Sequence, residues 1–175
     1  IIKRTGKSAL LEHIIDSTRY YVLIQWEGSA KLVHESTHSY ALIPNGKTLN
    51  VRVEYKELQP ETQGFSFAKS VIEVQKFWNS WWETGAFVDF GDCKDVRAKE
   101  LERRTVLSQY LTFINCANET PAQETGLTYN SWFGRPHLEM TWWHTIDFSL
   151  WNRPEVLETM LEWYNDKAYP EAKKI

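Results

Sequence analysis

Alternating apolar and polar residues over the first 60 positions predict an antiparallel β-sheet. Within 47–55, Leu49, Val51, Val53 and Tyr55 alternate with polar residues, which is the period of a strand with one face in water. Residues 19–27 are almost continuously apolar and predict a strand covered on both faces. The sequence Pro44-Asn45-Gly46 favours a turn between strands. Together with 10–15 and 38–43, about four or five strands are expected, forming one edge of a β-sandwich whose other strands precede Ile1.

From residue 66 the apolar period becomes helical. Large apolar residues at helical spacings predict a helix over 66–84, ended by Gly85. Further helices are expected over about 96–116, where Asp95 can act as N-cap, over 142–151 and over 154–168. The helix at 142–151 is apolar on nearly every side, so we expect it to be buried. A proline and good helix formers close the sequence, so we expect an internal fragment of a longer protein.

Residues 117–140 show no clear periodicity, and irregular segments of this length are usually functional. This stretch and the start of the next helix mix carboxylates, amides, imidazoles and large aromatic rings. Aromatic faces pack against the C–H faces of pyranose rings, while planar polar groups bind hydroxyls in pairs. The cluster therefore favours a sugar site. The alternative for each single residue is core packing by tryptophan and a hydrogen-bonded core histidine.

Length, charge and composition narrow the functional classes. The chain has 175 residues and a mass of 20.6 kDa, with 20 basic and 23 acidic residues. A net charge of −3 makes nucleic acid and an anionic membrane surface unlikely partners, and no apolar run is long enough for a membrane-spanning helix. Aromatic residues make up 14% of the chain, nine of them Trp. We expect Cys93 and Cys116 to be free thiols, which leaves the redox compartment open.

Other chemistries find little support. His137-Leu138-Glu139 has the H-x-E form of zinc deaminases, but the P-C-x-x-C half of that signature is missing. The spacing of His137, Glu139 and His144 matches no standard zinc motif, so no metal and no cofactor are expected. No nucleophile elbow, P-loop or dinucleotide fingerprint occurs. Arg103 and Arg104, with Glu100 and Glu102 nearby, predict a solvated or ion-paired helix face.

Four runs of sequence carry a family resemblance: RRTVLSQYL at 103–111, PAQETGLTYNSWFG at 121–134, HLEM at 137–140 and WWH at 142–144. Over about 95–165 the chain resembles bacterial six-hairpin glycoside hydrolases, which are related to the trehalase and maltose phosphorylase group (family 65). The resemblance implies an α+β chain: residues 1–62 as part of a β-sandwich, 63–94 as a helical linker, and 95–175 as the start of a catalytic (α/α)6 barrel. The rest of the same polypeptide would complete the barrel.

The resemblance also implies a site. Glu139 matches the position where family 65 members carry an aspartate that binds sugar hydroxyls, although the family's Phe-Trp-Asp-Thr-Glu string is not kept here. The catalytic acid and base would lie beyond residue 175, so no catalytic residue is assigned. The residues expected to bind the carbohydrate substrate are Glu124, Tyr129, Trp132, His137, Glu139, Trp143 and His144.

These expectations lead to a glycosidase as the favoured function. The alternative is a non-catalytic carbohydrate-binding or structural module built on the β-part. A phosphorylase would need a basic phosphate pocket, which residues 117–144 do not offer. For a bacterial enzyme of this kind, a periplasmic or extracellular location is favoured over the cytoplasm.

Overall fold

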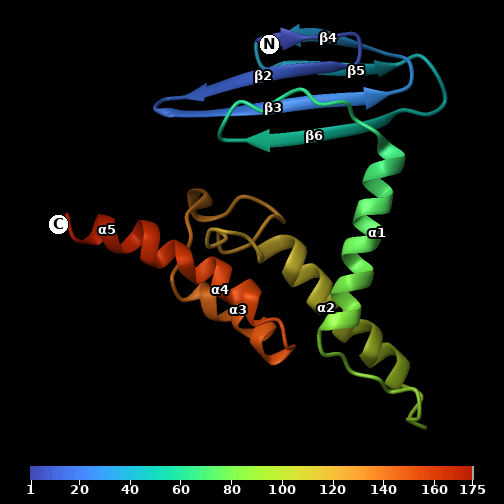
Figure 1. The fold of residues 1–175 in the computed structure, drawn as a ribbon, viewed down its shortest axis with the longest axis vertical. Helices are drawn as coiled ribbons and strands as arrows, with labels where there is room; N and C mark the ends of the chain where they lie inside the picture. The colour runs from blue at the N-terminus through green and yellow to red at the C-terminus, as the bar shows by residue number, and fades with distance from the viewer. Residues whose placement is uncertain (175) are drawn as a thin grey trace. The chain divides into compact units, whose positions relative to one another are not determined.

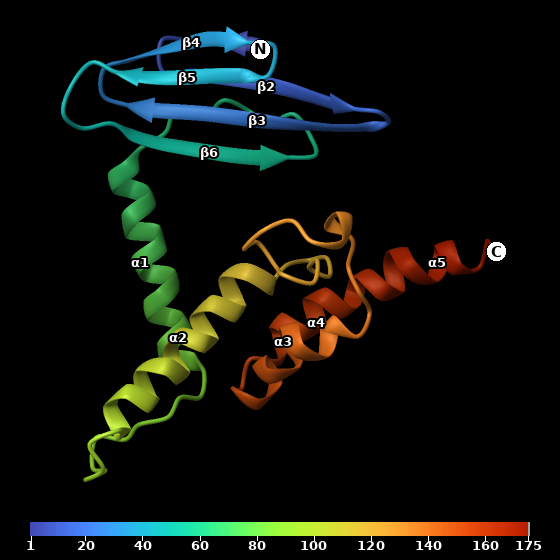
Figure 2. The same ribbon diagram turned by 180° about the vertical axis from the view of Figure 1, so that it is seen from behind.

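The computed structural model describes residues 1–174 and shows a mixed α+β chain (Figures 1 and 2). Contacts divide the chain into two compact units, Ile1–Phe77 and Trp78–Ile175. The first unit holds the strands, and the second holds most of the helices. Helix α1 (Phe67–Thr84) runs from the first unit into the second.

The first unit contains two antiparallel sheets, drawn from blue to teal in Figure 1. The larger sheet has the strand order β1-β2-β3-β6, and a β4-β5 hairpin forms the smaller one. Their bounds are β1 Lys3–Arg4, β2 Ser8–Ile15, β3 Thr18–Glu27, β4 Ala30–Ser36, β5 Ser39–Pro44 and β6 Asn50–Lys56. The four strand segments predicted from the sequence are confirmed, with ends shifted by a few residues. The sequence pattern predicts no separate strand at the position of β4.

Strand β3 is buried on both faces, as its continuous apolar sequence predicts. On one face, Val22 and Trp26 pack with residues of β2 and with Leu32 of the β4-β5 hairpin. On the other face, Leu23 is buried and pairs in register with Leu10, which is also buried. This strand is therefore the centre of the unit's core.

Strand β6 departs from the sequence expectation. Its alternation is present, but the apolar residues Val51, Val53 and Tyr55 are 41%, 48% and 69% exposed. The β4-β5 hairpin packs through Leu32 against the apolar cluster of β2 and β3, and none of the three β6 residues belongs to that cluster. The prediction of a strand is thus confirmed, whereas the prediction that its apolar face is covered is wrong.

The second unit is built from short helices around an aromatic cluster. Its elements are α2 (Ala98–Cys116), the 3-10 turn η1 (Trp132–Gly134), α3 (Met140–Leu150), α4 (Pro154–Trp163), the π-helical turn η2 (Tyr164–Ala168) and α5 (Tyr169–Ala172). The ring of Phe113 in α2 lies 4.2 Å from that of Trp81 in α1 and 6.1 Å from that of Phe148 in α3. These contacts make Trp81 a packing residue of the helical unit.

The predicted helices are confirmed, with two differences. Asp95 does not take the N-cap position, although its carboxylate accepts a hydrogen bond from the Arg97 amide at 2.9 Å. Helix α3 is not buried on all sides. Trp142, Trp143 and Leu150 are exposed, because contacts with α2 and α4 cover only the side that carries Thr145 and Phe148. Among the described residues, no helix combines the length and apolarity that a membrane span needs.

Arg153 ties the end of α1 to the turn between α3 and α4. Its side chain is 2% exposed, and its guanidinium donates to the carbonyls of Trp81 at 2.6 Å and Trp151 at 3.0 Å. The guanidinium carbon also lies 4.3 Å from the centre of the Trp81 ring, a cation–π contact. Burial lowers the pKa of this guanidinium. A Cβ on Gly85 would come within 1.8 Å of the guanidinium, so a larger residue at the position that follows α1 would require the Arg153 side chain to shift.

Candidate functional site

The irregular segment between α2 and α3 is ordered by its own side chains. The Gln123 amide donates to the carbonyls of Gly126 at 2.7 Å and Tyr129 at 3.2 Å, and its oxygen accepts from the Ser131 amide at 3.2 Å. The Thr125 hydroxyl lies 2.6 Å from the Tyr129 carbonyl and 2.8 Å from the Ser131 hydroxyl. Two polar residues outside the predicted binding set therefore give this loop its shape.

Gly126 anchors the loop to the last turn of α2. Its φ is +58°, in the left-handed region, and a Cβ at this position would lie 2.7 Å from the Asn115 carbonyl oxygen. Both facts require glycine, because the backbone atoms of a helix cannot move aside as a flexible side chain can. The loop at Gly126 thus lies too close to α2 to leave room for a side chain.

The tip of the loop holds aromatic residues in an unusual backbone conformation. Trp132, Phe133 and Gly134 have consecutive positive φ values of 47°, 60° and 72°. The left-handed region disfavours residues with a Cβ by roughly 1–2 kcal/mol each. The side chains of these strained residues nonetheless point into solvent, since Trp132 is 60% and Phe133 is 91% exposed. Strain of this kind is often found at functional sites.

Three of the predicted substrate-binding residues come together at this tip. The rings of Trp132 and His137 meet edge to face, with their centroids 5.4 Å apart. His137 Nδ1 lies 3.8 Å from a carboxylate oxygen of Glu139, which is too far for a hydrogen bond. We call Trp132, His137 and Glu139 the tip triad. It offers an aromatic face, an imidazole and a solvent-exposed carboxylate.

His144 lies apart from this group, in the interior. Its side chain is buried, and its Nε2 lies 2.9 Å from the main-chain carbonyl of Glu124. A carbonyl can only accept, so Nε2 carries the proton in this contact. The arrangement matches the alternative of a hydrogen-bonded core histidine. Glu124 takes part through its backbone, which joins the loop to α3.

Tyr129 and Trp143, the remaining predicted residues, are exposed. No ring contact joins either of them to Trp132 within residues 1–174. Tyr129 enters the loop's hydrogen bonding through its carbonyl, which leaves its phenol ring free on the surface. The predicted set therefore divides into the tip triad, two exposed aromatic residues and an internal contact between His144 and Glu124.

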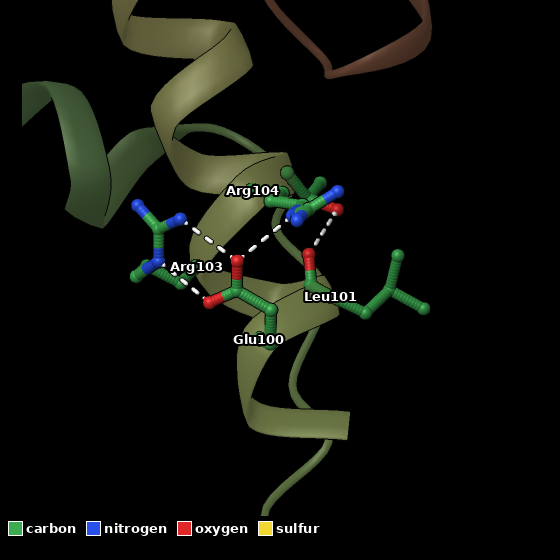
Figure 3. Close-up of polar contacts among 5 residues, drawn as sticks. Glu100, Leu101, Arg103 and Arg104 are labelled. Atoms are coloured by element: carbon green, nitrogen blue, oxygen red, sulfur yellow. Dashed lines mark hydrogen bonds and ion pairs between the residues drawn. The ribbon is translucent and has the colours of Figure 1, made fainter. Parts of the chain in front are cut away.

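The Arg103-Arg104 pair forms ion pairs with Glu100 on the surface of α2, as the sequence predicts (Figure 3). Both guanidinium groups bind the same carboxylate, at 2.8 Å in each case. These hydrogen bonds lower the pKa of Glu100 to about 2. The cluster is solvent-exposed, and both guanidinium groups are held by the Glu100 carboxylate.

The carboxylate of Asp147 is partly buried in the helical unit. Burial raises the pKa of Asp147, and one of its carboxylate oxygens has no hydrogen-bond partner in the described chain. Burial, together with the Asp147 charge, raises the pKa of the Cys116 thiol to about 11. Sequence patterns did not single out Asp147, because it lies in a helix of largely apolar composition. Both cysteines are free, Cys93 at the surface and Cys116 in the interior.

The described residues contain no group of three or more histidine, cysteine or acidic side chains placed to hold a metal ion. His137 and Glu139 face solvent at the tip, whereas His144 binds a carbonyl in the interior. Comparisons with protein-family models, with curated proteins and with solved structures find no match to the chain.

Proposed function

We propose that the loop between α2 and α3 binds carbohydrate through the tip triad, and that the chain belongs to a glycoside hydrolase. The observation that carries the proposal is the proximity of the Trp132, His137 and Glu139 side chains on a loop fixed by internal hydrogen bonds. A site held rigid before binding loses less entropy when the ligand arrives. The family resemblance of the same residues supports this reading.

Each member of the triad has a separate role in the proposal. The exposed face of Trp132 stacks on a pyranose ring, which is apolar on its C–H side. The Glu139 carboxylate accepts hydrogen bonds from sugar hydroxyls, and charged acceptors give the stronger bonds. His137 lies next to both, with its ring against Trp132 and its Nδ1 3.8 Å from the Glu139 carboxylate.

Hydrolysis requires more than binding. Glycosidases typically use two carboxyl groups, roughly 6.5–9.5 Å apart in inverting enzymes. Our proposal gives Glu139 a binding role and assigns no residue of this chain as acid or base. In the same proposal, the β-sandwich, helical linker and (α/α)6 barrel are the architecture to which the two units belong.

Calorimetric titration with glucose, maltose and trehalose tests the binding role. Replacing Glu139 by Gln removes a charged acceptor worth about 1.5–3 kcal/mol, so affinity should fall about tenfold or more. Trp132→Ala should weaken binding as well. Glu119→Gln is the matched control, because it neutralises another exposed carboxylate of the same segment and should leave affinity unchanged. Equal affinities for wild type and Glu139→Gln would refute the assigned role.

Activity gives a second test. Release of glucose from maltose or trehalose by the complete enzyme should fall more than tenfold in kcat/KM for Glu139→Ala. Dependence of the reaction on inorganic phosphate would identify a phosphorylase instead. Sugar binding by the chain with no catalysis by the complete enzyme would favour the non-catalytic module.

A further inference from the structure

A cavity of about 420 Å³ lies in the first unit, where β2 begins and β3 ends. This volume falls within the range of small-molecule sites, roughly 300–1,000 Å³. One wall comes from the two strands and the other from the segment that leads from β6 to α1. The residues that matter for its chemistry are Lys7, Ser8, Gln25, Trp26, Glu27 and Phe65.

Hydrogen bonds hold the walls of this cavity in place. Ser8 and Gln25 are register partners on neighbouring strands, and both are buried. The Gln25 amide donates to the carbonyl of Gln63, which ties the strands to the segment opposite. Glu27 accepts a hydrogen bond at 3.1 Å from the amide of Phe67, the first residue of α1. The cavity is therefore a formed feature of the unit, with both walls tied together.

The cavity is lined by one positive and one negative side chain that form no ion pair with each other. Lys7 and Glu27 both line it, yet no ion pair joins them within residues 1–174, and the Lys7 ammonium forms no other ion pair there. One positive and one negative group leave no net charge to favour an anion or a cation. A hydroxyl group can accept from an ammonium and donate to a carboxylate, so a ligand with several hydroxyls satisfies both.

We propose that this cavity is a second binding site and takes a neutral polyhydroxylated ligand of mono- or disaccharide size. Lys7 donates to ligand oxygens, Glu27 accepts from ligand hydroxyls through its carboxylate, and Phe65 supplies apolar contact. The site shares no residue with the tip triad and lies in the other unit. It therefore stands or falls independently of the proposed role of the loop.

The test separates the two sites by variant background. The double variant Trp132→Ala/Glu139→Gln disables the tip triad, and calorimetry with glucose, maltose, trehalose, xylose and cellobiose then reports the cavity alone. We expect residual binding at one site per chain. Adding Lys7→Ala or Glu27→Gln should weaken it at least fivefold. Lys31→Ala, an exposed lysine of β4 outside the cavity, is the matched control and should change nothing.

Folding of the variants is checked by circular dichroism melts. Glu27→Gln keeps an oxygen that can accept from the Phe67 amide, so a loss of binding in that variant reports the charge and not the fold. Absence of residual binding in the double variant, or residual binding that both cavity variants leave unchanged, would overturn the proposal. Binding of the zwitterion glycine betaine without binding of any sugar would overturn the ligand class.

Discussion

Substitution of Gly126 by alanine tests how the binding loop is held against α2. The new Cβ would meet two obstacles: a left-handed backbone, with φ at +58°, and the Asn115 carbonyl oxygen at 2.7 Å. The first costs about 1–2 kcal/mol, and overpacking adds about 1–3 kcal/mol. Since the obstructing atoms belong to helix backbone, the loop must move. We expect a loss of roughly 2–5 kcal/mol in the free energy of unfolding.

Two other glycines separate these contributions. Gly134 also has a positive φ, at +72°, but a Cβ there would find its nearest neighbour at an ordinary 3.5 Å. Gly134→Ala should therefore cost only about 1–2 kcal/mol. Gly46→Ala meets no atom within 4 Å and no positive φ, so a change within about 0.5 kcal/mol is expected. Urea unfolding followed by tryptophan fluorescence measures all three. A Gly126→Ala variant as stable as Gly46→Ala would refute the close contact between loop and helix.

Three further predictions concern the helical unit. At pH 8, Ellman's reagent should label exposed Cys93 and leave Cys116 unlabelled. Burial protects the Cys116 thiol, and its raised pKa of about 11 keeps it protonated. Equal labelling of the two cysteines would argue against the burial of Cys116. Titration of the carboxyl groups by NMR should give Glu100 a pKa of about 2. The ion pairs of Glu100 therefore stabilise the fold fully above its unfolded pKa of about 4.3, and this stabilisation is lost as pH falls through 2. Replacing both Arg103 and Arg104 by Gln should return the pKa towards 4.3, and a wild-type value already near 4.3 would contradict the ion pairs. Arg153→Met leaves buried carbonyls without donors and should lower the free energy of unfolding by about 2 kcal/mol or more. The control Arg103→Met, at an exposed arginine, should change that free energy by no more than about 1 kcal/mol. Equal shifts in melting temperature for the two variants would refute the anchoring role of Arg153.

Local periodicity predicted most elements of the fold because those elements follow their own sequence pattern. The continuous apolar run of β3 and the helical spacing over α1 are examples, and both are confirmed. Which surfaces are covered depends on how elements pack, and the sequence pattern does not contain that information. Val53 in β6 and Trp142 in α3 read as buried residues, yet both are exposed.

The candidate site shows the same division. The sequence brought Trp132, His137 and Glu139 into one candidate set because they are close along the chain, and the structure places His137 next to each of the other two. It left open whether His144 is a sugar ligand or a core histidine, because the contact of its ring with the Glu124 carbonyl spans 20 residues. The organising role of Gln123 was hidden for a related reason. An amide that binds three backbone groups of its own loop looks, in sequence, like any polar loop residue.

Assigned indole N–H signals, followed by NMR during titration with maltose and trehalose, test the central claim most directly. We predict that the Trp132 signal shifts and saturates with added sugar, and that Glu139→Gln weakens this response about tenfold. The Trp81 signal should stay in place, because its ring is packed between Phe113 and Phe148. A folded protein whose Trp132 signal does not move at saturating concentrations of either sugar would contradict the proposed carbohydrate site.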